Sequence, residues 1–335
     1  MKETYSPAAG TEKEKIPLLA VVGPTASGKT ALGVRLALRL DGEVVSADSM
    51  QIYKGMDIAT AKPTMAETCG VPHHLIGFRE PDAPFSVADY VEAAGPVIRD
   101  IAARGRLPIL VGGTGLYVDA LTDNIRFGEE KADPALRAAL QRQAEEEGGA
   151  AMLGRLRAVD PETAARLHPG DVRRIVRALE VYEATGRTMA EQRAQSRREP
   201  SPYDTFFIGI RCADRQKLYD RINRRVDAML EGGLLEEAAA CLQAGPAASG
   251  AAQAIGHKEL RPYLEGELSL AEAVENLKRE TRRYAKRQLT WFGRNPRIHW
   301  IEADELDAAG MEAQALEILQ AASFPAGNGQ KGGRT

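Results

Sequence analysis

The chain is 335 residues long, which at roughly 150 residues per domain predicts a core domain with an insertion or appendage. Its residues are 44% hydrophobic and 27% charged, which excludes disorder of the whole chain, a collagen-like repeat and a disulfide scaffold. The formal net charge of -3 argues against a histone-like coat of positive charge. Three distant cysteines (Cys69, Cys212 and Cys241) disfavour a thiolate zinc site and favour a reducing cytoplasm, and no apolar run is long enough to predict a membrane span.

The first third of the chain predicts alternating strands and helices. Short apolar runs predict strands at residues 17–22, 43–47, 73–77 and 107–111. Apolar residues at helical spacing predict a helix after the first strand and another that begins at Ser86 and ends near Gly105. This alternation predicts an α/β fold in which helices flank both faces of a parallel sheet.

The region 127–202 has a different pattern, because alanine, arginine, glutamate and leucine recur there at helical periods without a strand. We expect an all-helical insertion at these residues. A strand at 206–210, helices at 214–231, 234–244 and 269–292, and a last strand at 297–301 follow. The predicted catalytic core therefore comprises residues 16–126 and 203–323, and residues 1–15 and 324–335 are predicted to be disordered.

A glycine-rich loop between the first strand and helix matches the pattern G-x-x-x-x-G-K-[ST] at every fixed position. In such a loop, backbone N–H groups and the N-terminus of the following helix bind a polyphosphate. The lysine adds a positive charge, and the threonine hydroxyl can bind Mg²⁺. The predicted phosphate-binding residues are Gly23, Pro24, Thr25, Ala26, Ser27, Gly28, Lys29 and Thr30.

An acidic residue follows the second strand, not the fourth. The fourth strand ends in Gly112-Gly113-Thr114, where many motors and GTPases would carry an aspartate, whereas Asp48 follows the second strand. This arrangement favours a group transferase that binds a di- or triphosphate beside Asp48. A turn or helix-capping role for Asp48 remains an alternative.

Seven segments, in order along residues 17–302, resemble the bacterial tRNA dimethylallyltransferases of the IPP transferase family. They are the phosphate loop and the segments 46–57 (SADSMQIYKGMD), 60–63 (TAKP), 72–75 (PHHL), 112–117 (GGTGLY), 253–256 (QAIG) and 286–291 (KRQLTW). The resemblance implies a P-loop NTPase-like fold that, with Mg²⁺, transfers a dimethylallyl group from dimethylallyl diphosphate. The acceptor would be the N6 amine of the tRNA adenosine 3′-adjacent to the anticodon (position 37). It further implies a cytoplasmic enzyme, which we expect to be monomeric.

The resemblance also implies roles for individual residues. The loop would hold the diphosphate, with Mg²⁺ at Thr30. Asp48 would be the general base, and Thr114 and Arg221 would be the other catalytic groups, with Arg221 binding the leaving diphosphate. The implied tRNA-binding residues are Asp48, Ser49, Met50, Gln51, Arg173, Arg174, Arg177, Gln253, Gly256, His257, Lys258, Lys286, Arg287, Gln288, Thr290 and Trp291.

The last predicted helix is strongly basic. Residues 278–297 contain eight lysines or arginines and one acid, Glu280, so the helix suits a phosphate backbone, although a solvated helix face is a common alternative. Departures from the family pattern are Ala59 for Gly, Gly77 for Asp and His257 for Tyr. The role of His257 is the least secure of those implied, because this departure falls within a segment implied to contact RNA.

Three other functions fit parts of the sequence. The chain could prenylate free adenine nucleotides, which would leave the basic helix and the insertion without a purpose. It could be a small-molecule kinase that binds ATP at the loop and uses Asp48 as a base. It could also be an RNA-binding protein with a vestigial loop, although intact Lys29, Thr30 and Asp48 disfavour this.

Overall fold

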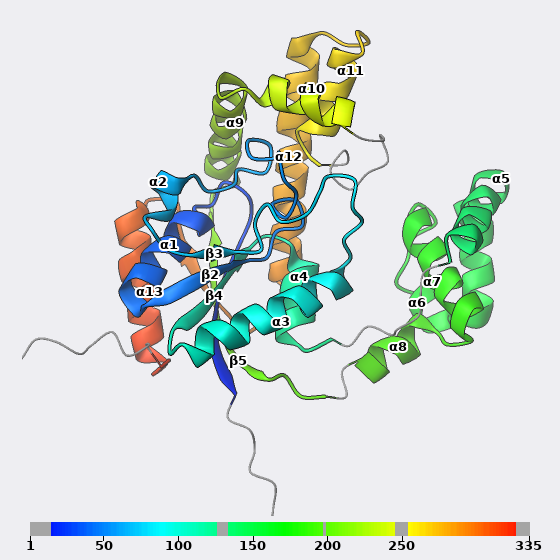
Figure 1. Cartoon of the computed structure of the whole chain (residues 1–335). Helices are drawn as coiled ribbons and strands as arrows, with labels where there is room; N and C mark the ends of the chain where they lie inside the picture. The colour runs from blue at the N-terminus through cyan, green and yellow to red at the C-terminus, as the bar shows by residue number, and fades with distance from the viewer. Residues whose placement is uncertain (1–14, 126–132, 197–198, 245–253, 326–335) are drawn as a thin grey trace, which may run out of the picture. The chain divides into compact units, whose positions relative to one another are not determined.

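The computed structural model describes residues 15–125, 133–196, 199–244 and 254–325 (Figure 1). The chain forms two compact units, one comprising Met1–Thr122 and Ser201–Thr335 and the other Asp123–Pro200. Among the described residues, no helix combines the length and apolar character that a membrane crossing requires.

The first unit is built on a sheet of six strands in the order β3-β2-β4-β1-β5-β6, in which every neighbouring pair is parallel. The chain reaches β2 and β4 on one side of β1 and β5 on the other, so loops at the carboxyl ends of β1 and β4 flank a crevice suited to ligands. The predicted parallel α/β sheet is confirmed. The strands are β1 (Ile16–Val22), β2 (Gly42–Ser46), β3 (His73–His74), β4 (Leu107–Gly112), β5 (Tyr203–Arg211) and β6 (Ile298–Glu302).

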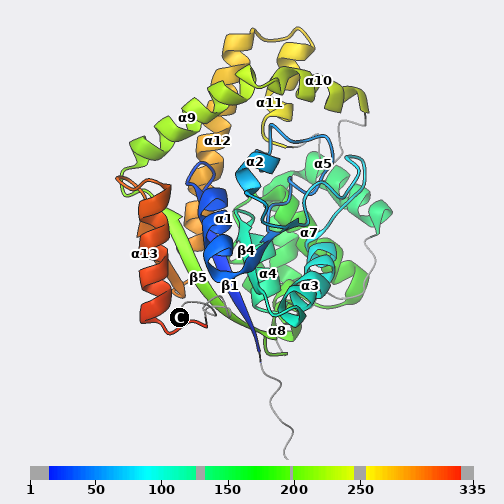
Figure 2. The ribbon, with the colours of Figure 1, turned by 60° about the vertical axis from the view of Figure 1, so that its left-hand side comes forward.

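Helices cover both faces of the sheet (Figure 2). On one face, α1 (Lys29–Leu40) and α13 (Ala308–Ala321) bury Leu32, Leu36 and Met311 against the strands. On the other, α3 (Val87–Ala103) and α4 (Gly115–Thr122) bury Tyr90 and Tyr117, whose rings stack 4.2 Å apart. Because apolar helices cover both faces, the central strands carry almost only apolar residues.

Four further helices and a short one complete this unit. They are α9 (Arg215–Glu231), α10 (Leu234–Ala244), α11 (His257–Leu264), α12 (Leu270–Phe292) and the short α2 (Met65–Thr68). In Figure 1, α9, α10 and α11 lie beyond one end of the strands, and α12 runs from there down to α4. Val226, Leu234, Leu260 and Leu277 join α9, α10, α11 and α12 in a separate apolar cluster. This cluster fixes α9 and α12 next to the strand ends that carry the loops.

The described residues of the second unit form helices only: α5 (Pro134–Val159), α6 (Pro161–Ala164), α7 (Val172–Thr185) and α8 (Met189–Ser196). Its core includes Leu140, Leu156, Ile175 and Leu179. The buried Glu180 carboxylate accepts two hydrogen bonds of 3.0 Å from the Arg137 guanidinium, which compensates the cost of burying its charge.

Several sequence predictions need adjustment. The strand expected at 73–77 is only His73–His74, and α11 and α13 were not predicted. The ends expected to be disordered lie almost wholly outside the described residues, but the Phe324 ring packs 5.4 Å from that of Phe206. The expected helix start at Ser86 is confirmed, because its side chain caps the Asp89 N–H and Asp89 caps Ser86 in return.

Candidate functional site

A cavity of about 330 Å³ lies in the first unit, at the carboxyl ends of β1, β2 and β4. One wall consists of the phosphate loop and the segment after β2, and the facing wall consists of α9 and α12. The α12 side chains that line it recur at helical spacing, so a single face of this helix forms the wall: Leu277, Thr281, Tyr284, Arg287 and Gln288.

The phosphate loop has the backbone shape that its sequence predicts. It leaves β1 at Gly23 (φ 148°) and enters α1 at Gly28 (φ 95°). Residues other than glycine rarely adopt such positive φ angles. A Cβ atom at Gly23 would lie 2.5 Å from the Ile210 carbonyl oxygen, so the loop is also tightly packed. The Ser27 hydroxyl is buried without a hydrogen-bond partner among the described residues, which leaves an unpaired polar group in a loop suited to an anion.

Gln288, from α12, ties the loop to the end of β4. Its carboxamide oxygen accepts a hydrogen bond from the Thr25 N–H (2.8 Å), and its nitrogen donates to the Gly113 carbonyl (2.9 Å). A Cβ atom at Gly113 would lie 2.1 Å from that nitrogen, so the contact requires glycine. We expected Gln288 to contact RNA, but the side chain is 5% exposed and its amide is used within the protein.

Asp48 follows β2 and lines the cavity. One of its oxygens accepts hydrogen bonds from the backbone N–H groups of Met50 (2.9 Å) and Gln51 (3.4 Å), so the carboxylate also holds the turn it begins. The Thr114 hydroxyl oxygen accepts a hydrogen bond of 2.9 Å from the Ser49 N–H. Asp48 and Thr114 are thus brought together from different strands, although Thr114 is not among the lining residues.

Two cations lie beside Asp48. The Lys29 Nζ donates to the Pro24 carbonyl oxygen at 2.6 Å, and burial, with the nearby Arg225, lowers the pKa of Lys29 to about 8 despite the opposing effect of Asp48. Burial also lowers the pKa of Arg225, which lines the cavity, while Asp48 acts to raise it. Two neighbouring, partly buried cations predict a strongly anionic ligand, because such a ligand would stabilise both charged forms.

Arg221, the arginine expected to bind the leaving diphosphate, is hydrogen-bonded within the protein. Its guanidinium donates to the Ala303 carbonyl oxygen at 2.6 Å, and the side chain is not among those that line the cavity. Arg225, one turn further along the same face of α9, does line the cavity. Residues four apart share a helix face, so the sequence alone could not decide which turn meets the loop.

The remaining wall of the cavity is largely apolar and suits a small hydrocarbon group. Tyr284 lies at its border with the polar part: its hydroxyl hydrogen-bonds Thr114 and Gln288, and burial, followed by the nearby Asp48 charge, raises its pKa. The apolar side chains come from β2, α9, α10, α12 and the connecting segments: Val44, Ile76, Ile222, Val226, Met229, Leu234, Ile255 and Leu277.

A model of the family described as IPP transferase matches residues 51–295, and one described as isopentenyl transferase matches residues 16–76. The tRNA dimethylallyltransferase of Halalkalibacterium halodurans is 49% identical over 88% of this chain and 93% of its own, and that of Roseiflexus castenholzii is 51% identical over 87% and 94%. The chain belongs to the IPP transferase family.

Solved structures show the same relationship. A crystal structure of a full-length tRNA isopentenylpyrophosphate transferase from Bacillus halodurans has a TM-score of 0.68 at 45% identity and covers 92% of this chain and 98% of its own. A eukaryotic dimethylallyltransferase acting on tRNA has a TM-score of 0.77 at 30% identity and covers 93% and 81%. The P-loop NTPase-like fold expected of an IPP transferase is thereby confirmed.

The residues expected to bind tRNA are spread over several parts of this IPP transferase. Ser49, Met50, Gln51, Gly256, Lys258 and Arg287 line the cavity together with Asp48. Lys286, Thr290 and Trp291 are exposed on α12, and the Trp291 Nε1 donates to Asp119 at 2.9 Å. Arg173, Arg174 and Arg177 are exposed on α7 in the second unit, whereas Gln253 lies outside the described residues.

His257 is not a surface residue. Its side chain is fully buried, and its Nε2 lies 3.1 Å from the Glu237 carboxylate. Glu237, Tyr284 and Arg225 are the side chains whose placement the sequence did not predict. The only signal for them was helical spacing, which identifies a buried face but not what that face contacts.

Proposed function

We propose that this IPP transferase transfers a dimethylallyl group from dimethylallyl diphosphate to the N6 amine of the adenosine at position 37 of a tRNA, releasing diphosphate. The names of its relatives support the reaction. The observation that carries the proposal is one cavity that contains a phosphate loop, two partly buried cations, a carboxylate and an apolar wall.

The chemistry needs each of these features. When the allylic C–O bond breaks, negative charge develops on the diphosphate, and donors that are already oriented stabilise it. We assign this role to the loop N–H groups, Lys29 and Arg225. An adenine amine is a weak nucleophile, so Asp48 accepts its proton as the C–N bond forms. The apolar wall binds the hydrocarbon and excludes water.

The residues present fit Mg²⁺. Among the described residues, no cluster of acidic, histidine or cysteine side chains could hold a metal by itself, and Mg²⁺ is usually bound by one or two protein oxygens together with substrate phosphates. The Thr30 hydroxyl supplies such an oxygen in the cavity. A Mg²⁺ held by Thr30 and the diphosphate would neutralise charge on the leaving group.

The acceptor base must leave its stacked loop to reach the Asp48 carboxylate in the cavity. We assign the anticodon stem-loop to the basic α12, whose exposed Lys286 and Trp291 offer a cation and a ring close to the cavity-lining Arg287. The exposed arginines of α7 give the helical unit a second basic surface for tRNA. Both contacts predict binding that weakens as salt is added.

Incubation with radiolabelled dimethylallyl diphosphate, Mg²⁺ and unmodified tRNA, followed by nucleoside analysis, tests the proposal. We expect label in N6-isopentenyladenosine, and none when guanosine replaces the adenosine at position 37. Label in free adenine nucleotides but not in tRNA would instead identify a nucleotide prenyltransferase. ATP-dependent phosphorylation of a metabolite, without any labelled RNA, would identify a kinase.

A further inference from the structure

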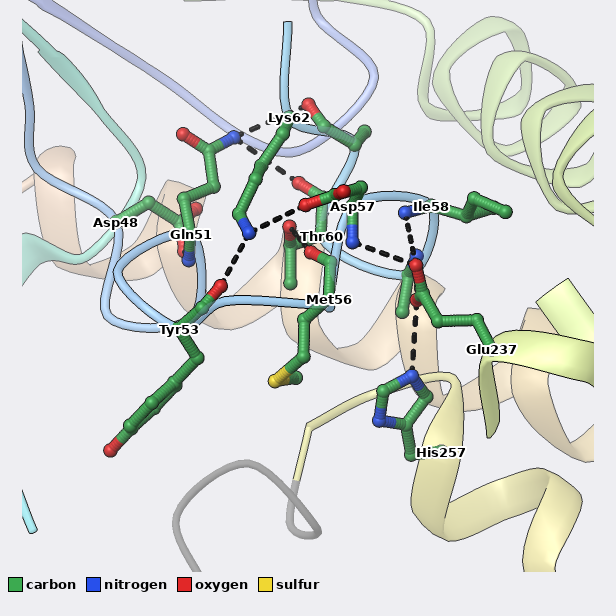
Figure 3. A network of polar contacts seen from close by, with 12 residues as sticks. Asp48, Gln51, Tyr53, Met56, Asp57, Ile58, Thr60, Lys62, Glu237 and His257 are labelled. Carbon is green, nitrogen blue, oxygen red and sulfur yellow. Dashed lines mark hydrogen bonds and ion pairs between the residues drawn. The ribbon is translucent and has the colours of Figure 1, made fainter. Parts of the chain in front are cut away.

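A carboxylate outside the cavity holds the turn that forms part of its wall. Glu237, on α10, accepts hydrogen bonds from the backbone N–H groups of Asp57 and Ile58 (2.7 Å each) and Ala59 (2.9 Å) (Figure 3). Hydrogen bonds to an ionised acceptor are stronger than those between neutral groups. The turn of residues 57–61 is therefore anchored to a helix 180 residues away in sequence.

His257 completes this anchor. A carboxylate can only accept, so the His257 Nε2, 3.1 Å from Glu237, carries a proton and donates it, while Nδ1 is buried and has no partner among the described residues. Burial acts to raise the pKa of Glu237, but the hydrogen bonds from His257 and the three amides outweigh it and lower the pKa. Glu237 is therefore ionised, and its negative charge is matched by donors.

Lys62 fixes the other side of the turn. Its side chain is 8% exposed, and its Nζ donates to the Asp57 carboxylate at 2.7 Å and to the Tyr53 carbonyl oxygen (Figure 3). The Thr60 hydroxyl donates to the Met56 carbonyl oxygen within the same turn. With both sides fixed, the carbonyl groups of the turn have defined directions.

Those carbonyl groups orient Gln51. Its amide nitrogen donates to the carbonyl oxygens of Thr60 (3.2 Å) and Ala61 (3.3 Å), and its amide oxygen accepts from the Ser46 hydroxyl (3.0 Å). Both amide protons thus point to the turn, and only the oxygen retains an unused lone pair. A flipped amide would place its oxygen against two carbonyl oxygens, so this orientation is the stable one.

The part of the wall formed by Gln51 and Asp48 therefore presents acceptors and no donor. Both residues line the cavity. The exocyclic amine of adenine has two N–H donors, one for the Asp48 carboxylate and one for a second acceptor. A 6-oxopurine has an acceptor at the same position and would meet two acceptors, which costs affinity because its oxygen stays unpaired.

We propose that Glu237 and His257 are positioning residues for selection of the acceptor base: by holding the turn of residues 57–61, they keep the Gln51 oxygen available to the exocyclic amine of adenine. Neither residue contacts the acceptor. The inference rests on the proposed function, because it takes adenine in a tRNA as the acceptor.

The test compares two anticodon stem-loop RNAs that differ only in adenosine or inosine at position 37, with affinities measured by fluorescence anisotropy without donor. For the wild-type protein we expect a preference for adenosine of about tenfold, within the range of a base-specific contact pair. Glu237→Gln replaces one acceptor oxygen with a donor group, which frees the turn. We expect this preference to fall to about twofold, while affinity for inorganic pyrophosphate stays unchanged.

Two histidine variants and one control make the result specific. His257→Leu removes the donor, so we expect the adenosine preference to fall. His257→Gln keeps an N–H donor at similar reach, so we expect it to retain the adenosine preference. Glu236→Gln, an exposed neighbour with the same charge change, behaves like wild type. Melting temperatures identify any variant that fails to fold, and if Glu237→Gln does so, the two histidine variants decide.

An adenosine preference that is absent from the wild type, or unchanged in both Glu237→Gln and His257→Leu, would overturn the inference. So would equal loss of adenosine, inosine and pyrophosphate binding, which indicates general disorder of the site. These outcomes are separate from failure of the proposed function, which would appear as a wild-type protein that prenylates no tRNA.

Discussion

Asp48 has two tasks that a substitution can separate. One oxygen holds the Met50 and Gln51 N–H groups, and the proposed reaction uses the carboxylate as a base. Asp48→Asn keeps an oxygen for the turn but cannot take the proton. We expect it to bind the stem-loop RNA nearly as well as wild type and to lower single-turnover rates about 10²-fold or more. Asp48→Ala should lose at least as much rate, and near-normal turnover in Asp48→Asn would remove the base role.

Lys29 makes diphosphate binding depend on pH. Its pKa of about 8 in the free protein is set by burial and Arg225, and a bound diphosphate favours the ammonium and raises that pKa. The contribution of Lys29 to binding is therefore constant below about pH 8. It weakens as pH rises from that value towards the pKa of Lys29 in the complex, by at most about tenfold per pH unit.

Calorimetry with an organic diphosphate in two buffers of different ionisation enthalpy would measure the linked proton uptake above pH 8. The control is Lys29→Arg, which remains charged and takes up no proton at this position. If the wild-type protein took up no proton, the lowered pKa would be wrong.

At the scale of the element, α9 carries a matched pair of arginines. Arg225 lines the cavity, while Arg221 is bound to the Ala303 carbonyl oxygen one turn away. Losing one donor that stabilises developing charge typically costs about 10²-fold in rate, so we expect Arg225→Ala to lower kcat/KM by that amount. Arg221→Ala should change it only about twofold, if its hydrogen bond stabilises the helix and not the transition state.

Steady-state kinetics on both variants, with melting temperatures, would decide between the two positions. If Arg221→Ala gave the larger loss with an unchanged melting temperature, the original assignment from the family resemblance would be correct. The same helix illustrates why the element scale is needed: its apolar face was predictable from spacing, but the turn that meets the phosphate loop was not.

At the scale of the whole molecule, Glu43 joins three elements of the sheet domain. The side chain is 2% exposed, and it pairs with Arg104 after α3, with Arg106 at 3.2 Å and with His74 of β3 at 2.7 Å. Hydrogen bonds from Arg104, opposed by burial and helped by His74, lower its pKa to about 2. A carboxyl group whose pKa is lower in the folded protein than in the unfolded chain stabilises the fold at pH values above its unfolded pKa. This stabilisation is lost as pH falls towards its folded pKa.

We therefore expect Glu43→Gln to lower the free energy of unfolding by about 3 kcal/mol at neutral pH, the cost of breaking a buried ion pair. The difference from wild type should shrink as pH falls from about 4.5 to about 2. Urea unfolding at several pH values measures both, with the exposed Glu92→Gln as control. A difference that did not change with pH would show that the ion pair is not its source.

The sequence by itself determined what depends on neighbours along the chain. The phosphate loop, its flanking strand and helix, the capping of α3 by Ser86 and the position of Asp48 after β2 all follow from local hydrogen bonding, backbone conformation and apolar period. These features need only a few consecutive residues, so pattern and family resemblance were sufficient.

Only the tertiary structure decided which distant side chains complete the site. Gln288 meets Thr25 across 263 residues, Glu237 meets the 57–59 turn across about 180, and Arg225 rather than Arg221 lines the cavity. The physical reason is that a helical period specifies which face is buried, whereas the partner of that face depends on how whole helices pack against the ends of the sheet.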